Sequence, residues 1–212
     1  MSKKVKEDVI EKLVSLSGPY FIENPFDGTC NIGLSDEVSE EIVLKCQNNL
    51  KDLARVCNET QQNMQDGILK QRVKDLAVQA EMLNEKEMVY AEVHFRNTET
   101  DIYKGHEKAE RFDALAETVC NGKDTIADMQ NGTEYNFYGG VSGYNGDAYI
   151  KGFFNETGLK ELRKVTDEIC VAGYRLEEVK EVSLEKEKRE VQKGSLKWTS
   201  RKTDNKEQEN TL

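Results

Sequence analysis

Apolar residues recur at helical spacing at the beginning of the chain. They are three or four positions apart among lysines and glutamates: Val5, Val9, Leu13 and Leu16. This spacing predicts a short amphipathic helix over residues 3–16. Residues 19–33 contain both prolines of the chain and predict a loop, whose aromatic side chains we expect to hold it against the fold.

A longer helical pattern begins after Ser35, a candidate N-cap, and continues to residue 86. Its apolar stripe shifts at Gln65-Asp66-Gly67, where the helix either bends or reverses into an antiparallel hairpin. Because glycine is a poor helix former, we favour the hairpin. Beyond this point the apolar residues alternate spacings of four and three, as in a coiled-coil seam. We therefore take three of them as candidate self-association residues of a homo-oligomer: Leu69, Leu76 and Leu83.

After residue 87 the period of the pattern changes from 3.6 to 2. The predicted elements are, in order, a strand over 89–96, a helix over 106–120, strands over 133–138 and 148–154, a helix over 159–169 and a strand over 175–184. This is the βαββαβ order of a ferredoxin-like sandwich, in which two helices cover one face of a four-stranded sheet. The sequence thus predicts an α+β fold.

Three regions follow from these patterns. Residues 1–87 form a helical region with a helical hairpin or short coiled coil, and residues 88–184 form the α+β sandwich. Residues 185–212 contain few apolar residues, which predicts an edge hairpin followed by a flexible, disordered C-terminal tail.

The charge balance argues against a protein that grips phosphate backbones. The chain has 40 acidic and 30 basic residues and a net charge of −10. The tail is the exception, since residues 183–212 carry eight basic and six acidic residues, a net +2. An acidic folded surface suits an inhibitor that occupies the basic cleft of a nucleic-acid-handling protein, such as a mobile-element product directed against a host nuclease.

Other features of the sequence bear on the cellular compartment of the protein and on whether it binds a metal or a cofactor. The sequence has neither a run of about 20 apolar residues nor the apolar core of a signal peptide, so we expect a cytoplasmic protein that does not enter membranes. The five cysteines are odd in number and never form Cys-x-x-Cys, which favours reduced thiols over disulfides or a zinc site. We expect no metal and no cofactor. The glycine-rich run over 139–147 lacks the phosphate-loop pattern and predicts a flexible hairpin loop.

Candidate catalytic thiols have no supporting signature. His94 and His106 are the two histidines, and either could couple with Cys120 or Cys170. Cysteines on apolar helix faces usually belong to the core. We therefore assign no catalytic residue, and a small thiol enzyme is an alternative.

Carboxylates are plentiful but scattered along the sequence. Glu92 and Glu134 could lie on neighbouring strands as an acid–base pair, which would give a carboxylate enzyme as a variant of the same alternative. A solvated sheet face explains them equally well. The sequence therefore favours a non-catalytic protein.

Aromatic residues gather in the hairpin predicted over 133–154, which holds seven of the sixteen in the chain. This is more than one face of two strands can bury, and exposed aromatic residues are typical of protein interfaces. The candidate partner-binding residues are Tyr135, Tyr138, Tyr144, Tyr149 and Phe153. We expect a protein–protein interaction module with a protein partner.

Single-stranded nucleic-acid binding through the same hairpin is a further alternative. Residues 151–154 resemble, over four positions, the strand with which RNA-recognition modules stack bases on aromatic side chains. The charge opposes this alternative, because residues 91–182 include eighteen acidic and eleven basic residues. Direct nucleic-acid binding is therefore not our expectation.

Overall fold

A computed structural model describes residues 7–16, 20–22, 30–32, 42–46, 49–99, 101–131, 134–138 and 141–184. Within these ranges the side chains of residues 7, 20–22, 30–32, 68, 102, 134–138 and 141–145 are not described. The edge hairpin and tail that the sequence predicts over residues 185–212 lie outside the described residues.

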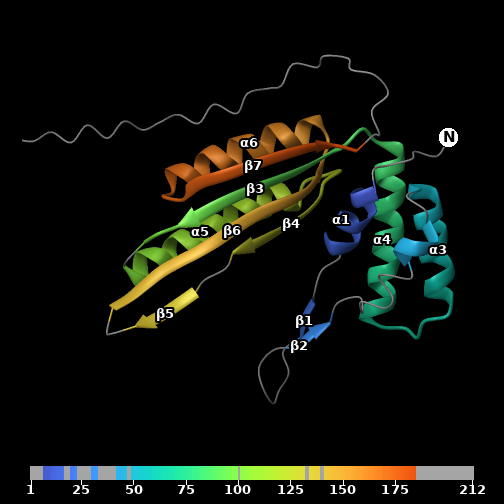
Figure 1. Cartoon of the computed structure of the whole chain (residues 1–212), viewed down its shortest axis with the longest axis horizontal. Coiled ribbons are helices and arrows are strands. Elements are labelled where there is room, and N and C mark those ends of the chain that lie inside the picture. The colour runs from blue at the N-terminus through green and yellow to red at the C-terminus, as the bar shows by residue number, and fades with distance from the viewer. Residues whose placement is uncertain are drawn as a thin grey trace, which may run out of the picture.

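The N-terminal part of the chain is mainly helical (Figure 1). It contains helix α1 (Glu7–Leu16), strands β1 (Tyr20–Ile22) and β2 (Cys30–Ile32), and helices α3 (Leu50–Gln62) and α4 (Ile68–Glu85). The prediction of a loop over residues 19–33 is partly wrong, because β1 and β2 form an antiparallel pair within this range. Their pairing is a contact between segments that the proline and glycine signals do not reveal.

The long helix predicted from residue 36 is interrupted before α3. Residues 42–46 are helical, but Asn49 is extended and caps a new helix, since its side chain accepts hydrogen bonds from the N–H groups of Lys51 and Asp52. Helix α3 ends at Gln62 and α4 begins at Ile68, on either side of the phase shift in the sequence. The two helices lie side by side and share one buried apolar cluster (Figure 1).

The second part combines an antiparallel sheet with two helices. Its elements are β3 (Val89–Asn97), α5 (Ile102–Cys120), β4 (Ile126–Asn131), β5 (Glu134–Tyr138), β6 (Val141–Phe154), α6 (Glu156–Val171) and β7 (Arg175–Ser183). The sheet has the order β4-β6-β3-β7, and β5 pairs with the far part of β6. Each of these strand pairs is antiparallel. The chain is therefore an α+β protein, as its sequence predicts.

The sheet of the structure differs from the predicted sheet in two details. The sequence pattern misses β4, because Asp128 and Gln130 make Ile126–Asn131 only weakly apolar. The glycine-rich run is also not a loop over its whole length, since β6 begins at Val141 and pairs with β5 from there. The pairing of two strands supplies the backbone hydrogen bonds that local propensity does not predict.

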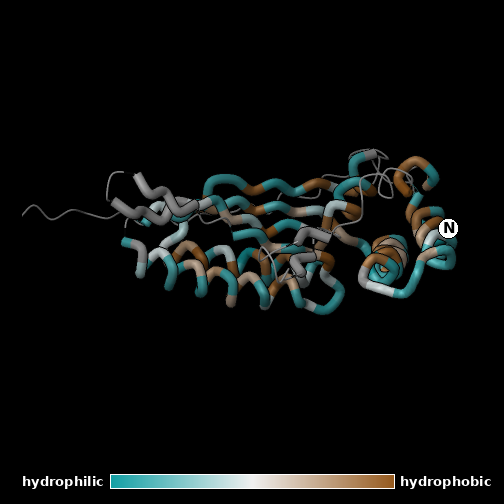
Figure 2. The backbone as a smooth tube through the Cα atoms, turned by 90° about the horizontal axis from the view of Figure 1, so that it is seen from below, coloured by the Kyte–Doolittle hydropathy of each residue, from teal (hydrophilic) through white to brown (hydrophobic). Residues whose placement is uncertain are grey.

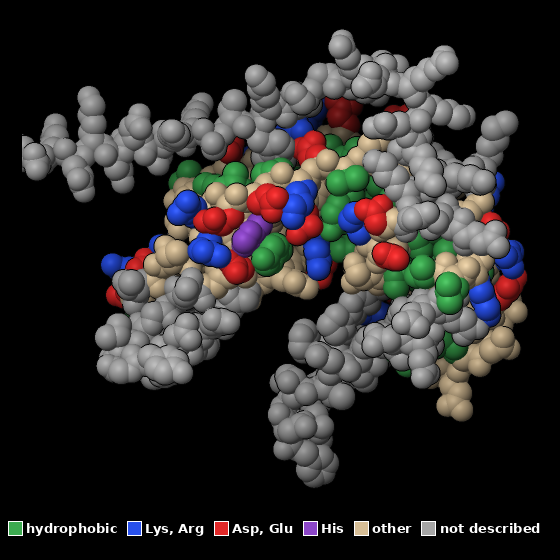
Figure 3. Space-filling view, viewed as in Figure 1, with side chains coloured by type: hydrophobic (Ala, Val, Ile, Leu, Met, Phe, Trp, Pro, Cys, Tyr) green, Lys and Arg blue, Asp and Glu red, His purple; other side chains and the backbone are tan. Residues whose placement is uncertain are grey.

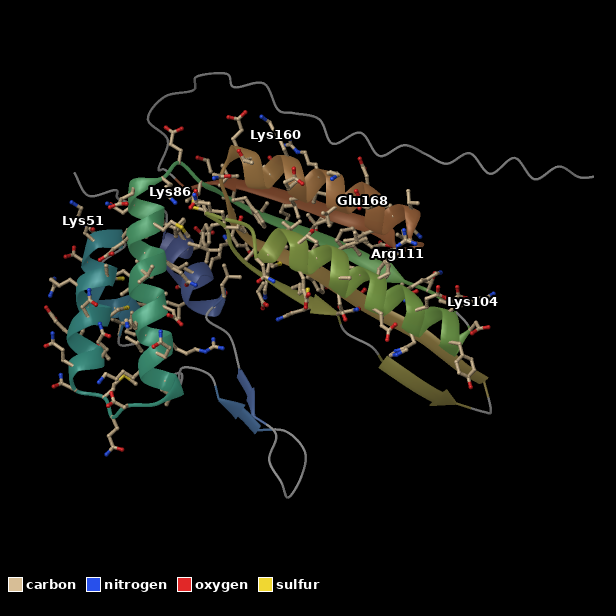
Figure 4. The ribbon with its side chains drawn as sticks, turned by 180° about the vertical axis from the view of Figure 1, so that it is seen from behind. Lys51, Lys86, Lys104, Arg111, Lys160 and Glu168 are labelled. Atoms are coloured by element: carbon tan, nitrogen blue, oxygen red, sulfur yellow. The ribbon has the colours of Figure 1, made fainter. Side chains whose placement is uncertain are left out.

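Helices α5 and α6 cover one face of this sheet, so that sheet and helices form two layers (Figure 2). The buried residues between the layers include Val93 and Phe95 of β3, Phe112 of α5 and Ile169 of α6. Phe95 meets Phe112 edge to face, with ring centroids 5.7 Å apart. The outer surface of α5 and α6 is charged, with Lys104, Arg111, Lys160 and Glu168 among its exposed side chains (Figure 4). None of the described helices is long and apolar enough to cross a membrane.

Candidate partner-binding face

Side chains alternate between the two faces along each strand, and this alternation determines which residues lie on the face opposite α5 and α6. In β3, Ala91, Val93 and Phe95 point to α5 and α6, so the residues between them point the other way. The register places the corresponding residues of β6 and β7 beside them. We call the following group the open face: Glu92, His94 and Arg96 of β3, Asp147, Tyr149 and Lys151 of β6, and Glu178 and Lys180 of β7.

An aromatic pair lies in the middle of the open face. The rings of His94 and Tyr149 are stacked, with centroids 4.4 Å apart and planes 8° from parallel. His94 Nε2 lies 3.1 Å from Asp147 Oδ1, and Arg96 Nε donates a hydrogen bond of 3.1 Å to the same oxygen. The hydrogen bond with His94, followed by the contact with Arg96, lowers the pKa of Asp147. The Asp147 carboxylate thus holds two neighbouring cationic or polar side chains in place.

Charges of both signs surround this pair (Figure 3). Glu92 lies between Lys151 of β6 and Lys180 of β7 in the register of the sheet. Lys180 Nζ is 3.0 Å from Glu178 Oε2, and the hydrogen bond to Glu178 raises the pKa of Lys180. The open face therefore presents alternating charges and is not a basic track of the kind that follows a nucleic-acid backbone.

The predicted partner-binding residues have different environments. Tyr149 is half-buried on the open face, whereas Phe153 is completely buried and meets Tyr90 edge to face at 5.3 Å. Phe153 therefore offers no surface to a partner in this structure. Tyr135 and Tyr144 lie opposite each other on β5 and β6, and Tyr138 ends β5. The side chains of these three tyrosines are outside the described residues.

Residues 151–154 of β6, which resemble an RNA-binding strand, present no aromatic side chain at the surface. Phe153 belongs to the buried cluster that includes the helical part, and Phe154 belongs to the cluster under α5 and α6. Both side chains are 0% exposed. Stacking of bases on these two residues would require the cores to open.

The predicted self-association seam faces the interior of its own chain. Leu76 and Leu83 are 0% and 1% exposed, in the cluster that α3 and α4 share. Leu69 is 37% exposed. The heptad spacing is explained by packing within the helical part, and Leu76 and Leu83 are not available to a second copy.

The thiols that the sequence suggests as nucleophiles are separated from His94. Cys120 and Cys170 contact the apolar cluster on the α5 and α6 side of the sheet, and His94 lies on the other side. His106 and Cys120 are fourteen residues apart on the same helix, which corresponds to about 21 Å. Burial raises the pKa of Cys120 to about 12 and also raises the pKa of Cys170. Both thiols are therefore protonated near neutral pH.

The suggested carboxylate pair is also not formed by neighbouring strands. Glu92 lies on β3, which pairs with β6 and β7, whereas Glu134 lies on β5, which pairs with β6 opposite Asn145. Lysines are the neighbours of Glu92 in the register. Among the described residues, no three His, Cys, Asp or Glu side chains lie close enough together to hold a metal ion.

Sequence reasoning missed the group of His94, Arg96 and Asp147. The alternation in β3 places His94 and Arg96 on one side, but Asp147 is 53 residues from His94 and joins it only through the strand register. Comparisons with protein-family models, with curated proteins and with solved structures found no match to this chain. The geometry of the open face is therefore the basis for a functional proposal.

Proposed function

We propose that this protein is a non-catalytic interaction module that binds a partner protein through the open face. The observation that carries this proposal is the stacked pair of His94 and Tyr149, held beside Asp147 and Arg96 on a sheet face. Among the described residues, no helix or strand lies over this pair, while the other face of the sheet is packed against α5 and α6.

The chemistry of the open face fits a protein partner better than other partners. Tyrosine and arginine are among the residue types that contribute most to binding at protein interfaces, and mixed charges can select a partner of complementary pattern. Salt bridges within the chain already order Arg96 and Lys180, which reduces the entropy that binding would remove.

Replacement of Tyr149 tests this proposal. The Tyr149→Ala chain should bind a captured and purified partner about thirtyfold more weakly than the unmodified chain, because a central aromatic residue contributes roughly 2 kcal/mol or more. Tyr103→Ala is the matched control, since Tyr103 is 85% exposed on α5, in the other layer. Partner affinities are measured by calorimetry after capture from the native host, with thermal unfolding to show that both variants are folded.

Equal binding by the Tyr149→Ala and unmodified chains would contradict the open face as the binding surface. Equal loss of binding in the Tyr149→Ala and Tyr103→Ala chains would show that the loss is not specific to the open face, and it would also contradict the proposal. A catalysed reaction that depends on His94 and Asp147 would contradict the non-catalytic role.

A more specific form of the proposal is an acidic inhibitor that occupies the basic cleft of a nucleic-acid-handling protein. The net charge of −10 supports it. Binding should then weaken steeply between low and moderate salt and should compete with DNA for the partner. Binding that does not change with salt would contradict this form but not the broader proposal.

Two further assignments belong with this proposal. We assign the sheet and its two helices to the ferredoxin-like topology, which the order β4-β6-β3-β7 and the antiparallel pairings support. We also propose that the protein acts in the cytoplasm. The free thiols of Cys57, Cys120 and Cys170 support a reducing compartment.

A further inference from the structure

Helix α1 covers one end of the sheet face that carries the proposed binding surface. Val9, Ile10 and Leu13 of α1 are at most 1% exposed, and they share a buried cluster with residues of three strands, namely Tyr90, Ile126 and Phe153. Lys12 adds a cation–π contact, with its Nζ 4.9 Å from the centre of the Tyr90 ring. The helix lies between α4 and the sheet (Figure 1).

The covered end continues directly into the open face. In the register of β3 and β6, the pair Tyr90 and Phe153 is followed by Glu92 and Lys151 and then by the stacked His94 and Tyr149. The same side of the sheet is therefore apolar beneath α1 and polar beyond it. Without α1, the two parts would form one continuous surface.

The docking of α1 is also what keeps it helical. It has ten residues, and isolated helices shorter than about 12 to 15 residues are marginal in water. Its ion pair between Asp8 and Lys12 lies within the helix and adds little, since exposed pairs of this spacing contribute only a few tenths of a kcal/mol. Burial of its apolar residues is the main stabilisation, so α1 should leave the sheet as a unit.

We call the part of the sheet beneath α1, formed by Tyr90, Ile126 and Phe153, the seat of this helix. We propose that α1 can be displaced and that the seat is then a docking site for an amphipathic helix of a partner protein. The seat itself defines the chemistry of this helix. It needs apolar side chains at the spacing of Val9, Ile10 and Leu13, and a lysine or arginine that reaches the Tyr90 ring. The inference rests on the proposed role of the open face, which such a helix would contact alongside its seat.

The test uses the full chain and a fluorescent peptide of residues 1–18 as the probe. In the unmodified chain α1 competes with the peptide at a high effective concentration, so binding should be weak. In the Leu13→Asp chain this competitor is undocked, and the peptide should bind at least about tenfold more tightly. Glu11→Gln is the matched control in the chain, because Glu11 is exposed on α1 and its change leaves the seat occupied. A peptide that carries Leu13→Asp should not bind either chain.

Hydrogen exchange on the unmodified chain is a second measurement that does not depend on a variant. The amides of α1 should exchange through local opening, at least about tenfold faster than those of α4 and β3. Amides of α1 as protected as those of β3 would overturn the proposal, as would a folded Leu13→Asp chain that binds the peptide no better than the unmodified chain. A Leu13→Asp chain that cannot fold would also overturn it, because α1 would then be a necessary part of the core.

These results are separate from the Tyr149→Ala experiment. The peptide and exchange measurements need no identified partner, so they can fail while the open face binds its partner as proposed. Peptide binding together with unchanged partner affinity in the Tyr149→Ala chain would support the seat and contradict the open face.

Discussion

At the scale of single residues, burial determines the chemistry of the cysteines. Cys57 is 0% exposed, and burial raises its pKa to about 12. Cys120 is only partly buried, yet burial is also the largest cause that raises its pKa to about 12, ahead of its acidic neighbours Asp128 and Glu117. Since the thiolate is the reactive form, neither residue is activated as a nucleophile.

The thiols should therefore react slowly in the folded protein. At pH 7.5 we expect alkylation of Cys57 and Cys120 by iodoacetamide to be on the order of a thousandfold slower than in the unfolded chain, whose thiols have a pKa of about 8.5. Mass spectrometry over time, with a sample in guanidinium chloride as the control, measures both rates. Rapid modification of Cys120 would contradict the protonated state of its thiol and would support the alternative hypothesis of a thiol enzyme.

The same pKa values predict how stability depends on alkaline pH. Between about pH 8.5 and about pH 12, the thiols of Cys57 and Cys120 are ionised in the unfolded chain but still protonated in the native state. The native state then binds more protons, so the free energy of unfolding falls as the pH rises through this range. Urea unfolding at a series of pH values measures the effect, and Cys57→Ser with Cys120→Ser should reduce it.

At the scale of elements, β6 joins both neighbours because one of its residues has no side chain. Gly152 lies opposite Ala91 of β3 and Ala127 of β4. A Cβ atom at this position would overlap the carbonyl oxygen of Ile126 and the Cα of Ala127. The close approach of β4 to the sheet therefore requires glycine here.

Gly152→Ala should separate β4 from β6. We expect it to lower the free energy of unfolding by about 2 kcal/mol or more, because backbone atoms and not a flexible side chain would have to move. Gly67→Ala is the matched control, since no atom lies within 4 Å of the Cβ position there; because Gly67 is the N-cap of α4, where alanine is less favourable, it should lower the free energy of unfolding by no more than about 1 kcal/mol. Urea unfolding measures both variants, and equal stabilities would contradict the described contact of β4.

At the scale of the whole molecule, one buried cluster joins the helical part to the sheet. It contains Leu53 of α3, Leu76 of α4 and Leu13 of α1 together with Phe153 of β6. A second cluster lies between the sheet and the helices α5 and α6. Because β3 and β6 contribute residues to both clusters, the two parts should unfold together.

Leu76→Ala tests this coupling. Removal of a fully buried leucine should cost about 3 kcal/mol, and the cost should appear in the protection of β3 amides as well as α3 amides. Native-state hydrogen exchange measures both, and Leu69→Ala is the control because Leu69 is 37% exposed. Loss of protection confined to α3 and α4 would show instead that the helical part unfolds independently.

The sequence by itself determined the type and order of most elements. Helical spacing in α1, α3 and α4, and alternation in β3, are local properties that arise because one side of each element is buried. They were sufficient for the α+β class. Where local pattern is weak, as in the Ile126–Asn131 strand, or where glycines dominate, as at the beginning of β6, the sequence was not sufficient.

Only the tertiary structure decided which surface each pattern faces. The seam of Leu76 and Leu83 could equally have met a second copy, but α3 of the same chain covers it. Asp147 reaches His94 and Arg96 because an antiparallel register brings distant residues together, and α1 covers Phe153 because the chain folds back onto its own sheet. Such contacts depend on the relative placement of elements, which spacing along one segment does not contain.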